Sequence, residues 1–320
     1  MPTQGESAEL TAVTMELIPI PPFRLDHTAW ALRRRSENLV DRWDGACYSR
    51  VLLLGGRPTE VHVSQRGSPE KPRLAVRVIG EHVTSQAKSE AARILRRMLG
   101  LETDLTAFYR LAARDNRLRP LVERYHGLKP VRFPTVFEAL ANAIACQQFT
   151  LVAGLRLLGE LARRGRVRLA TPTGVHYGFP QPGDILRLPP RTFRRLGFSH
   201  QKTVALRELS RAVLQGRFPG EALDAQDNDS AIHVLLEFHG VGRWSAEYAL
   251  LRGLGRWDVF PADDVGAQKG LARWLHLPRP MDSDRVRRVL RPWQPYAGLI
   301  YFHLLLESLR ARQAGVASRR

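Results

Sequence analysis

Cysteine is nearly absent from this chain of 320 residues, which has only Cys47 and Cys146. Two cysteines cannot form a disulfide framework, a four-cysteine zinc site or a four-cysteine iron–sulfur site. No apolar run approaches the roughly 18 residues that a helix needs to span a bilayer. The N-terminus is polar and acidic and lacks the basic start of a secretory signal. We therefore expect a protein of the reducing cytoplasm with no membrane partner.

Negative charge is also scarce. Aspartate and glutamate total 31 against 49 lysines and arginines, which gives a formal net charge of +18 and a sequence pI of about 11.0. Such an excess favours a polyanionic partner, above all nucleic acid. Arginine-biased codon usage is the alternative, since only five of the basic residues are lysines. On charge alone we favour a nucleic-acid partner over an idle basic surface.

Short alternating segments bounded by glycine and proline turns characterise the first third of the chain. A loose tail is expected over residues 1–16, and the proline-rich residues 18–22 are expected to enter a first strand. Further strands are predicted at 49–54, 60–64 and 73–79, and helices at 28–32 and 85–99. Residues 17–104 are thus predicted to form an α+β domain with an antiparallel sheet.

After about residue 104, helical spacing of apolar residues replaces alternation. Helices are predicted within 135–164 and at 203–214, 230–238, 245–253, 265–275, 284–290 and 297–311. A glycine- and proline-rich link is expected at 171–183 and a basic tail at 313–320. Residues 105–312 are therefore predicted to form an all-helical region.

A first motif, F-H-G-V-G-R-W-S-A, occupies residues 238–246. It predicts a helix end, a tight turn with Gly240 and Gly242, and the start of a new helix. Glycine permits a positive φ and the close approach of another backbone. The free amides at a helix start suit a phosphate. A glycine pair alone, however, is more often an ordinary turn between two helices.

A second motif follows, in which Pro261 and Ala262 precede Asp263, Asp264 and a predicted helix. By itself this pattern indicates an N-cap together with a charge that favours the helix dipole.

Together, the two motifs make the sequence resemble the helix-hairpin-helix (HhH-GPD) DNA glycosylase superfamily, and within it the AlkA-type 3-methyladenine DNA glycosylase II family. The likeness rests on five segments: residues 240–248, 259–264, A-I-A-C-Q-Q at 143–148, 195–198 with Lys202, and P-W-Q-P-Y-A at 292–297. It is close over residues 130–310. The N-terminal domain more loosely resembles the TATA-box-protein-like domain of that family.

The resemblance implies a monofunctional enzyme of base excision repair that needs no cofactor. Such an enzyme flips an alkylated base out of double-stranded DNA and hydrolyses its glycosidic bond. Asp264 is implied as the catalytic carboxylate, and Asp263 is expected to be a cap or a hydrogen-bonding support. Gly240, Gly242 and Arg243 are implied to hold the DNA backbone. The superfamily also implies a monovalent cation at the hairpin, and no catalytic metal.

The damaged base is expected in an aromatic pocket. Trp244 and Tyr248, four residues apart on one predicted helix, share a face. Pairs at this spacing usually belong to a core, and the resemblance favours the pocket. Phe302 stands where the family usually has a tryptophan, and His239 stands where it usually has a proline.

The glutamine motif is expected to face the lesion. Gln147 and Gln148 are its candidates, and either Gln148 or Phe149 is the wedge that fills the vacated base stack. Lys202 is a candidate phosphate contact.

Other functions stay open. A bifunctional glycosylase–lyase, such as an 8-oxoguanine glycosylase, would need a lysine where this chain has Trp244, and Lys202 and Lys269 do not match that position. A non-catalytic helix-hairpin-helix DNA-binding protein would not explain Asp264 and the aromatic residues. Only the charge supports an RNA-binding protein. We expect a monomer, associated with the nucleoid of a prokaryotic cytoplasm, and the preferred lesion stays open.

Overall fold

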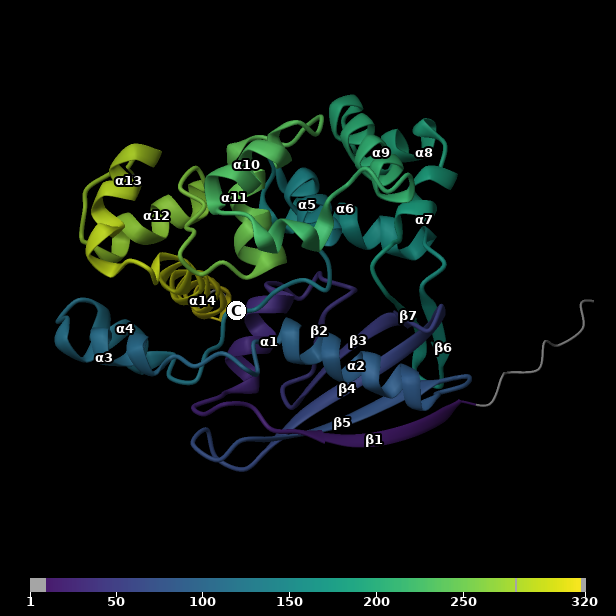
Figure 1. The fold of residues 1–320 in the computed structure, drawn as a ribbon, viewed down its shortest axis with the longest axis horizontal. Helices are drawn as coiled ribbons and strands as arrows, with labels where there is room; N and C mark the ends of the chain where they lie inside the picture. Colours follow the sequence, from purple (N-terminus) through teal and green to yellow (C-terminus); the bar gives the residue numbers. More distant parts are fainter. Residues whose placement is uncertain (1–9, 280, 318–320) are drawn as a thin grey trace, which may run out of the picture.

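The chain folds into a sheet domain with a helical region stacked on it (Figure 1). The computed structural model describes residues 10–279 and 281–317, with side chains as far as residue 311. One antiparallel sheet has the strand order β1-β5-β4-β3-β2, and a separate hairpin pairs β6 with β7. The strands are β1 (Thr11–Leu17), β2 (Arg42–Trp43), β3 (Cys47–Leu54), β4 (Arg57–Arg66), β5 (Arg73–Gly80), β6 (Arg168–Thr171) and β7 (Gly174–Tyr177). The predicted α+β domain followed by a helical region is confirmed.

Helices make up most of the remaining chain. They are α1 (Leu25–Arg33), α2 (Ser85–Met98), α3 (Thr106–Arg114), α4 (Leu118–Arg124), α5 (Val136–Cys146), α6 (Leu151–Arg164), α7 (Pro182–Arg187), α8 (Pro190–Leu196), α9 (His200–Leu214), α10 (Asn228–Leu236), α11 (Arg243–Ala249), α12 (Val265–Trp274), α13 (Ser283–Leu290) and α14 (Ala297–Ala317). Short 3-10 turns occupy Gly220–Ala225 and Arg291–Trp293, and a π-helical turn, Leu250–Leu254, continues α11. No helix of the described residues is both long and apolar enough to cross a bilayer.

The sheet forms because alternate residues of its strands are apolar and face one side. Val61 lies opposite Val78, and Val63 lies opposite Val76, across the β4–β5 pair. These four side chains are buried and belong to the same hydrophobic cluster as Ala87, Ala91, Leu95 and Met98 of α2. Apolar residues every third or fourth position give α2 one apolar face, which covers the sheet.

Three boundary predictions are wrong. The tail expected at residues 1–16 contains β1, which pairs along its whole length with β5. This edge strand has apolar residues at alternate positions, Val13, Met15 and Leu17, of which only Leu17 is fully buried. The link expected at 171–183 contains β7 and the start of α7. The tail expected at 313–320 is entered by α14, which continues to Ala317, and residues 318–320 lie outside the described part. The predicted division at residue 104 stays a prediction.

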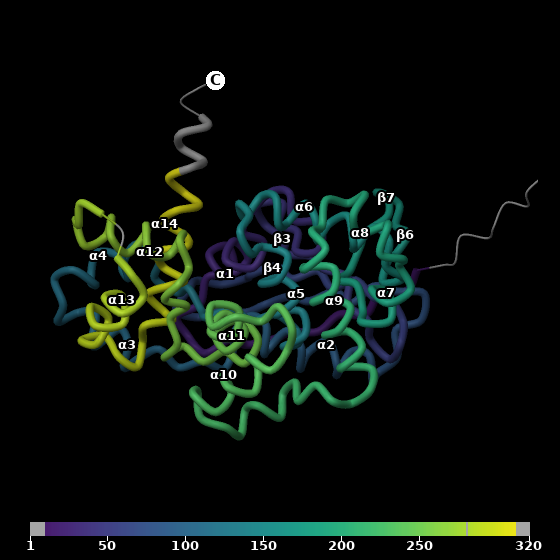
Figure 2. Tube along the Cα trace, turned by 90° about the horizontal axis from the view of Figure 1, so that it is seen from above, coloured from purple at the N-terminus to yellow at the C-terminus, as the bar shows by residue number. Residues whose placement is uncertain are grey.

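The helical region has two groups of helices with α11 between them. Seen from above, α12–α14 gather at one end and α6–α9 at the other (Figure 2). One hydrophobic cluster joins residues of the sheet domain to residues of α12 and α14, whereas a second consists mainly of residues from α5 to α11. The chain therefore returns at its C-terminal end to pack on its N-terminal domain, and a seam between the two clusters runs beside α11.

A buried ion-pair network fastens the sheet domain to α5. Arg50 of β3 is 1% exposed; its guanidinium lies 2.8 Å from Asp41 and 2.6 Å from Glu138 of α5. Burial alone would lower the pKa of Arg50, but the charges of Glu138 and Asp41 outweigh burial and raise this pKa. Tyr48 adds a hydrogen bond from its hydroxyl to Asp41. The three ionised groups satisfy one another, so removing one leaves an uncompensated buried charge.

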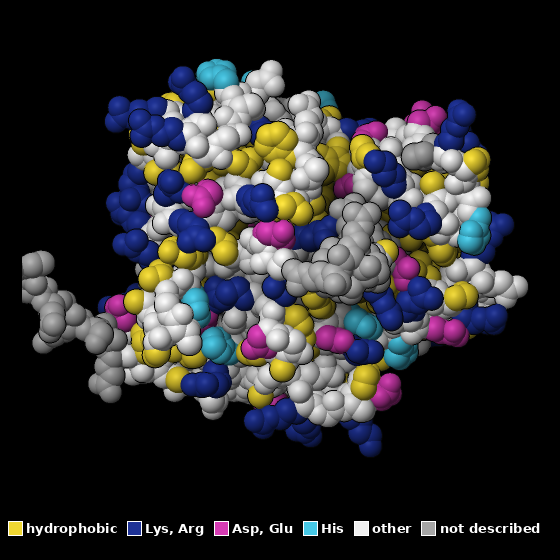
Figure 3. All heavy atoms as spheres, turned by 180° about the vertical axis from the view of Figure 1, so that it is seen from behind, with side chains coloured by type: hydrophobic (Ala, Val, Ile, Leu, Met, Phe, Trp, Pro, Cys, Tyr) yellow, Lys and Arg dark blue, Asp and Glu magenta, His cyan; other side chains and the backbone are white. Residues whose placement is uncertain are grey.

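The surface carries the excess of positive charge that the composition requires. Figure 3 shows Lys and Arg side chains spread over one whole face of the molecule, with far fewer acidic side chains among them.

We expect Arg50→Met to lower the free energy of unfolding by about 3–5 kcal/mol, because Asp41 and Glu138 would stay buried without their partner. The matched control is Arg73→Met in β5, whose ion pair with Glu16 is exposed at both ends. That pair should contribute less than about 1 kcal/mol. Urea unfolding followed by circular dichroism measures both, and equal losses for the two variants would contradict the role given to Arg50.

Candidate active site

The Asp264 carboxylate has two separate tasks. Its Oδ1 accepts a hydrogen bond of 2.8 Å from the backbone N–H of Ala267, which makes Asp264 the N-cap of α12. Its Oδ2 lies 3.3 Å from the indole nitrogen of Trp244 and 3.4 Å from the hydroxyl of Tyr301. Asp263 is exposed. The expectation that Asp263 is the cap is wrong, because the chain enters the helix at Asp264 itself.

Aromatic side chains gather around Oδ2 of Asp264. Trp244 and Tyr248 lie on one face of α11 with ring centroids 5.7 Å apart. Tyr301 of α14 comes from the other side of the seam and packs edge-on against Phe260. Burial, and next the negative charge of Asp264, raise the pKa of Tyr301 well above its ordinary value, so its hydroxyl stays protonated and can donate to Oδ2. The structure thus brings three electron-rich rings together close to one carboxylate.

The structure does not place Phe302 beside Asp264. Phe302 is 1% exposed, and its ring lies 5.3 Å from the guanidinium carbon of the buried Arg252. The adjacent Tyr301 takes the position at the carboxylate instead. One residue turns a helix by about 100°, so neighbours in sequence face different surroundings. The expectation that Phe302 lies at the carboxylate is therefore wrong, and Tyr301 is the residue of this pair that contacts Asp264.

Arg34 is a further component that sequence reasoning missed. It follows α1 in the N-terminal domain, and its backbone has a φ of 61°. Its buried guanidinium donates to the hydroxyl of Tyr248 at 3.1 Å and to the side-chain oxygen of Asn142 at 2.7 Å. No local pattern marks Arg34 among its neighbouring arginines, since its partner Tyr248 is 214 positions away.

The hairpin between α10 and α11 uses its two glycines differently. Gly240 has a φ of +78°, and a Cβ there would lie 2.4 Å from the Cβ of Ala205. Gly242 has a φ of −95°, so the expected freedom for positive φ is used at Gly240 alone. A Cβ at Gly242 would meet nothing within 4 Å. Gly242 is exposed and precedes the first free amides of α11, so space for an approaching ligand remains there.

The glutamine motif reaches this hairpin. The Gln147 side-chain amide donates to the carbonyl of Gly240 at 2.8 Å and to the hydroxyl of Ser245 at 2.9 Å. Gln148 follows with a φ of +56°, and Phe149 is 44% exposed. Gln147 thus fixes the end of α5 to the hairpin, while Gln148 and Phe149 stand at the turn beyond it.

Lys202 and Arg243, which are predicted to contact the DNA backbone, both interact with other groups of the protein. The Lys202 ammonium is buried, donates to the carbonyl of Ala145 at 3.0 Å and lies 3.5 Å from the ring centroid of Phe149. Burial lowers its pKa. This geometry contradicts a direct phosphate contact by Lys202. Arg243 is half exposed and pairs with Glu247 at 3.1 Å.

Two hairpin carbonyls accept hydrogen bonds within the protein. The carbonyl of Gly240 accepts from Gln147, and that of Phe238 accepts from the N–H of Val241, and each oxygen keeps a second lone pair. The implied monovalent cation at the hairpin stays a prediction, and no step of the chemistry below depends on one. Among the described residues, no group of three or more His, Cys, Asp or Glu side chains could hold a metal ion.

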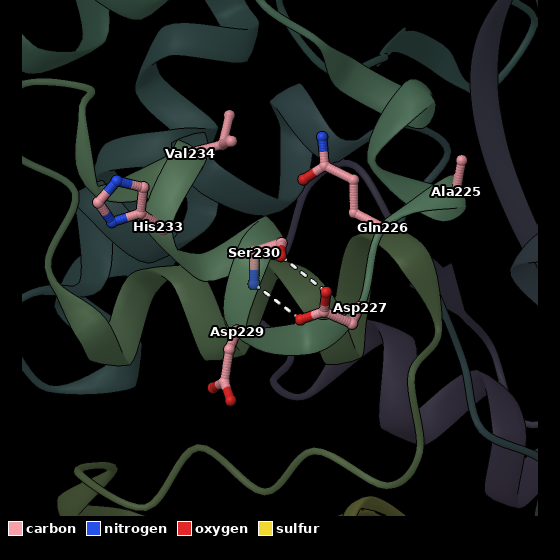
Figure 4. A pocket seen from close by; sticks show the side chains of 7 residues that line it. All are labelled: Ala225, Gln226, Asp227, Asp229, Ser230, His233 and Val234. Carbon is pink, nitrogen blue, oxygen red and sulfur yellow. Dashed lines mark hydrogen bonds between the residues drawn. The ribbon is translucent and has the colours of Figure 1, made fainter.

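A separate hollow of about 650 Å³ lies over the start of α10 (Figure 4). Asp227 caps this helix by accepting from the backbone N–H and the hydroxyl of Ser230, and Asp229 also lines the hollow. Two carboxylates disfavour the binding of a phosphate, and the capping of α10 accounts for Asp227. This hollow is therefore a poor candidate for the reactive site.

Comparison with known families divides the chain into two matches. Residues 141–295 match the HhH-GPD superfamily base excision DNA repair protein, and residues 14–138 match the AlkA N-terminal domain. The two matches meet close to the start of α5.

Individual relatives extend these matches over most of the chain. A DNA-3-methyladenine glycosylase of Bacillus subtilis is 25% identical over 275 residues, which are 85% of this chain and 90% of the relative. DNA-3-methyladenine glycosylase 1 of Schizosaccharomyces pombe is 31% identical over 165 residues, covering 51% of this chain and 68% of the relative. The solved 3-methyladenine DNA-glycosylase of Archaeoglobus fulgidus superposes with a TM-score of 0.80 at 25% identity, over 91% of this chain and 97% of that one.

The capping role of Asp264 can be measured without any ligand. We expect Asp264→Ala to lower the free energy of unfolding by about 0.5–2 kcal/mol, because the N–H of Ala267 loses its acceptor. Asp263→Ala, at an exposed neighbour with the same charge, should change it by less than about 0.5 kcal/mol. Denaturant unfolding of the two variants decides the matter, and a larger loss at Asp263 would reverse the assignment of the cap.

Proposed function

The chain belongs to the HhH-GPD superfamily of base excision DNA repair proteins and carries an AlkA N-terminal domain, and we propose that it is a monofunctional DNA glycosylase that removes alkylated bases. The observation that carries this proposal is the second carboxylate oxygen of Asp264, Oδ2, which lies between the indole N–H of Trp244 and the hydroxyl of Tyr301. The relatives named 3-methyladenine DNA glycosylases support 3-methyladenine-like bases as the substrate class.

The hairpin between α10 and α11 is the proposed binding site for the DNA backbone. A base within a duplex is out of reach, so the enzyme must flip the nucleotide at a cost of a few kcal/mol. The exposed Gly242 and the amides after it offer the backbone a close approach, and Arg243 adds positive charge. Gln148, exposed at the turn after α5, is the proposed wedge in the vacated stack, with Phe149 as the alternative. We propose a monomer that acts on chromosomal DNA in a prokaryotic cytoplasm.

The chemistry follows from the charge that develops as the glycosidic bond breaks. The bonding electrons leave with the base, and the sugar becomes positively charged. Asp264 Oδ2 would stabilise this charge and orient the water that attacks C1′, while Oδ1 stays bonded to α12. The rings of Trp244, Tyr248 and Tyr301 would stack on the flipped base. A cationic alkylated purine is attracted to such rings and is already a good leaving group.

The other functions explain less of the site. A lyase needs an amine that forms an imine with the sugar, and the indole of Trp244 occupies the place given to that lysine by the resemblance. Lys269 is exposed, and Lys202 is bonded to the carbonyl of Ala145. In a non-catalytic DNA-binding protein the cap of α12 would explain Oδ1 of Asp264, but not the placement of Oδ2 between Trp244 and Tyr301.

The carboxylate is tested by Asp264→Asn. We expect excision of 3-methyladenine or 7-methylguanine from a single-lesion duplex to fall by at least about 10²–10³-fold, since one well-placed charge can contribute that much. Binding to the same duplex should stay close to that of the wild type. Asp263→Asn is the matched control and should excise normally. A dead Asp263→Asn with an active Asp264→Asn would reverse the two assignments.

Water as the nucleophile is tested by trapping. During turnover with borohydride, no covalent protein–DNA adduct should form, and strands should break only after alkali. If the wild type does trap, Lys202→Arg shows whether that lysine supplies the amine, because burial lowers its pKa. Efficient trapping by the wild type would overturn the monofunctional assignment.

A further inference from the structure

A buried carboxylate that the proposed chemistry does not use lies on α11, between the pocket and the hairpin. Glu247 has a side chain that is 5% exposed. Its Oε1 accepts from Arg243 at 3.1 Å and from Arg287 of α13 at 3.0 Å. Its Oε2 accepts from the backbone N–H of Ala262 at 3.0 Å. The two arginines compensate the charge of Glu247 through Oε1. The hydrogen bond from Ala262 to Oε2 is therefore not needed to compensate that charge.

That bond holds the segment that leads into Asp264. Ala262 is fully buried, and its carbonyl accepts from the side-chain amide of Gln268 at 2.8 Å. Glu247 and Gln268 therefore fix both polar groups of one residue. A backbone hydrogen bond closes a turn around Ala262, because the N–H of Asp264 donates to the carbonyl of Pro261 at 3.0 Å. The position of Ala262 within this turn determines where the backbone of Asp264 begins α12.

We infer that Glu247 is a positioning residue that, with Gln268, holds Ala262 so that Asp264 Oδ2 faces the pocket. This inference rests on the proposed function of Asp264. An ordinary ion pair would need only Arg243 and Arg287. Glu247 instead directs its second oxygen across to a loop 15 residues further along the chain. Small displacements of a reacting group reduce the rate steeply, by about 10²-fold for 1 Å.

If Glu247 is a positioning residue, its loss should lower the rate of base excision without lowering the affinity for DNA. Glu247→Ala should slow single-turnover excision by about 10–100-fold. Its affinity for a duplex with a tetrahydrofuran abasic analogue should stay within about threefold or tighten, because Arg243 is freed and a negative charge beside the hairpin is lost. Gln268→Leu removes the other bond to Ala262 from a half-buried position, and should slow excision by about 2–10-fold.

The matched control is Glu160→Ala on α6. Glu160 also pairs with two arginines, Arg163 and Arg164, but its side chain is 43% exposed and it lies in another part of the chain. Its loss should change neither rate nor affinity. Circular dichroism verifies that each variant is folded at the assay temperature.

Hydrogen exchange of the Ala262 amide adds a readout that needs no activity. Exchange of this amide should speed up in Glu247→Ala and stay unchanged in Glu160→Ala. An unchanged excision rate in Glu247→Ala, or a loss of affinity as large as the loss of rate, would overturn the inference. An unchanged exchange rate at Ala262 would do the same. If the wild type excises no base, the proposed function of the enzyme fails, and the exchange measurement still shows whether Glu247 holds Ala262.

Discussion

The division of the Asp264 carboxylate between a helix and a pocket is the constraint from which the site is built. One oxygen caps α12 and cannot move without breaking that bond, so the other oxygen has a fixed direction. Trp244 and Tyr301 meet it from the two sides of the seam, and both are side chains of well-packed helices. A charge held in place before the reaction needs no reorganisation as positive charge develops on the sugar. Helix capping and the proposed catalysis therefore depend on the same carboxylate.

Buried arginines extend this constraint into the N-terminal domain. Arg34 reaches from the end of α1 to the hydroxyl of Tyr248, and Arg252 of the π-helical turn donates to the carbonyl of Ala31. The rings of Phe133 and Phe302 lie against the Arg252 guanidinium and shield it from water. A buried cation needs such partners. The N-terminal domain thus contacts the residues next to Asp264 through buried arginines, in addition to the hydrophobic cluster that it shares with α12 and α14.

Much of the fold follows from local patterns. Alternating apolar residues predict β3, β4 and β5, and helical spacing predicts most helices from α5 onward, because burial on one face imposes a period of 2 or 3.6. The edge strand β1 and the hairpin of β6 and β7 were missed. The two hairpin strands have four residues each and are partly exposed, so they need few apolar residues of their own. β1 does alternate at Val13, Met15 and Leu17, but the first strand was expected at the proline-rich residues that follow it.

The sequence by itself determined the family resemblance, the order of a sheet domain and a helical region, the choice of Asp264, and the pairing of Trp244 with Tyr248 on one helix face. Each of these follows from short segments of the sequence, each read from residues that are neighbours in the chain. Only the tertiary structure placed Tyr301 rather than Phe302 at Asp264, directed Lys202 to the carbonyl of Ala145, and brought Arg34 and Glu247 to the site. These contacts join segments 15 to 214 positions apart, through side chains whose direction depends on the packing of whole helices. The periodicity of apolar residues indicates which face of a helix or strand is buried, but not which distant residue that face contacts.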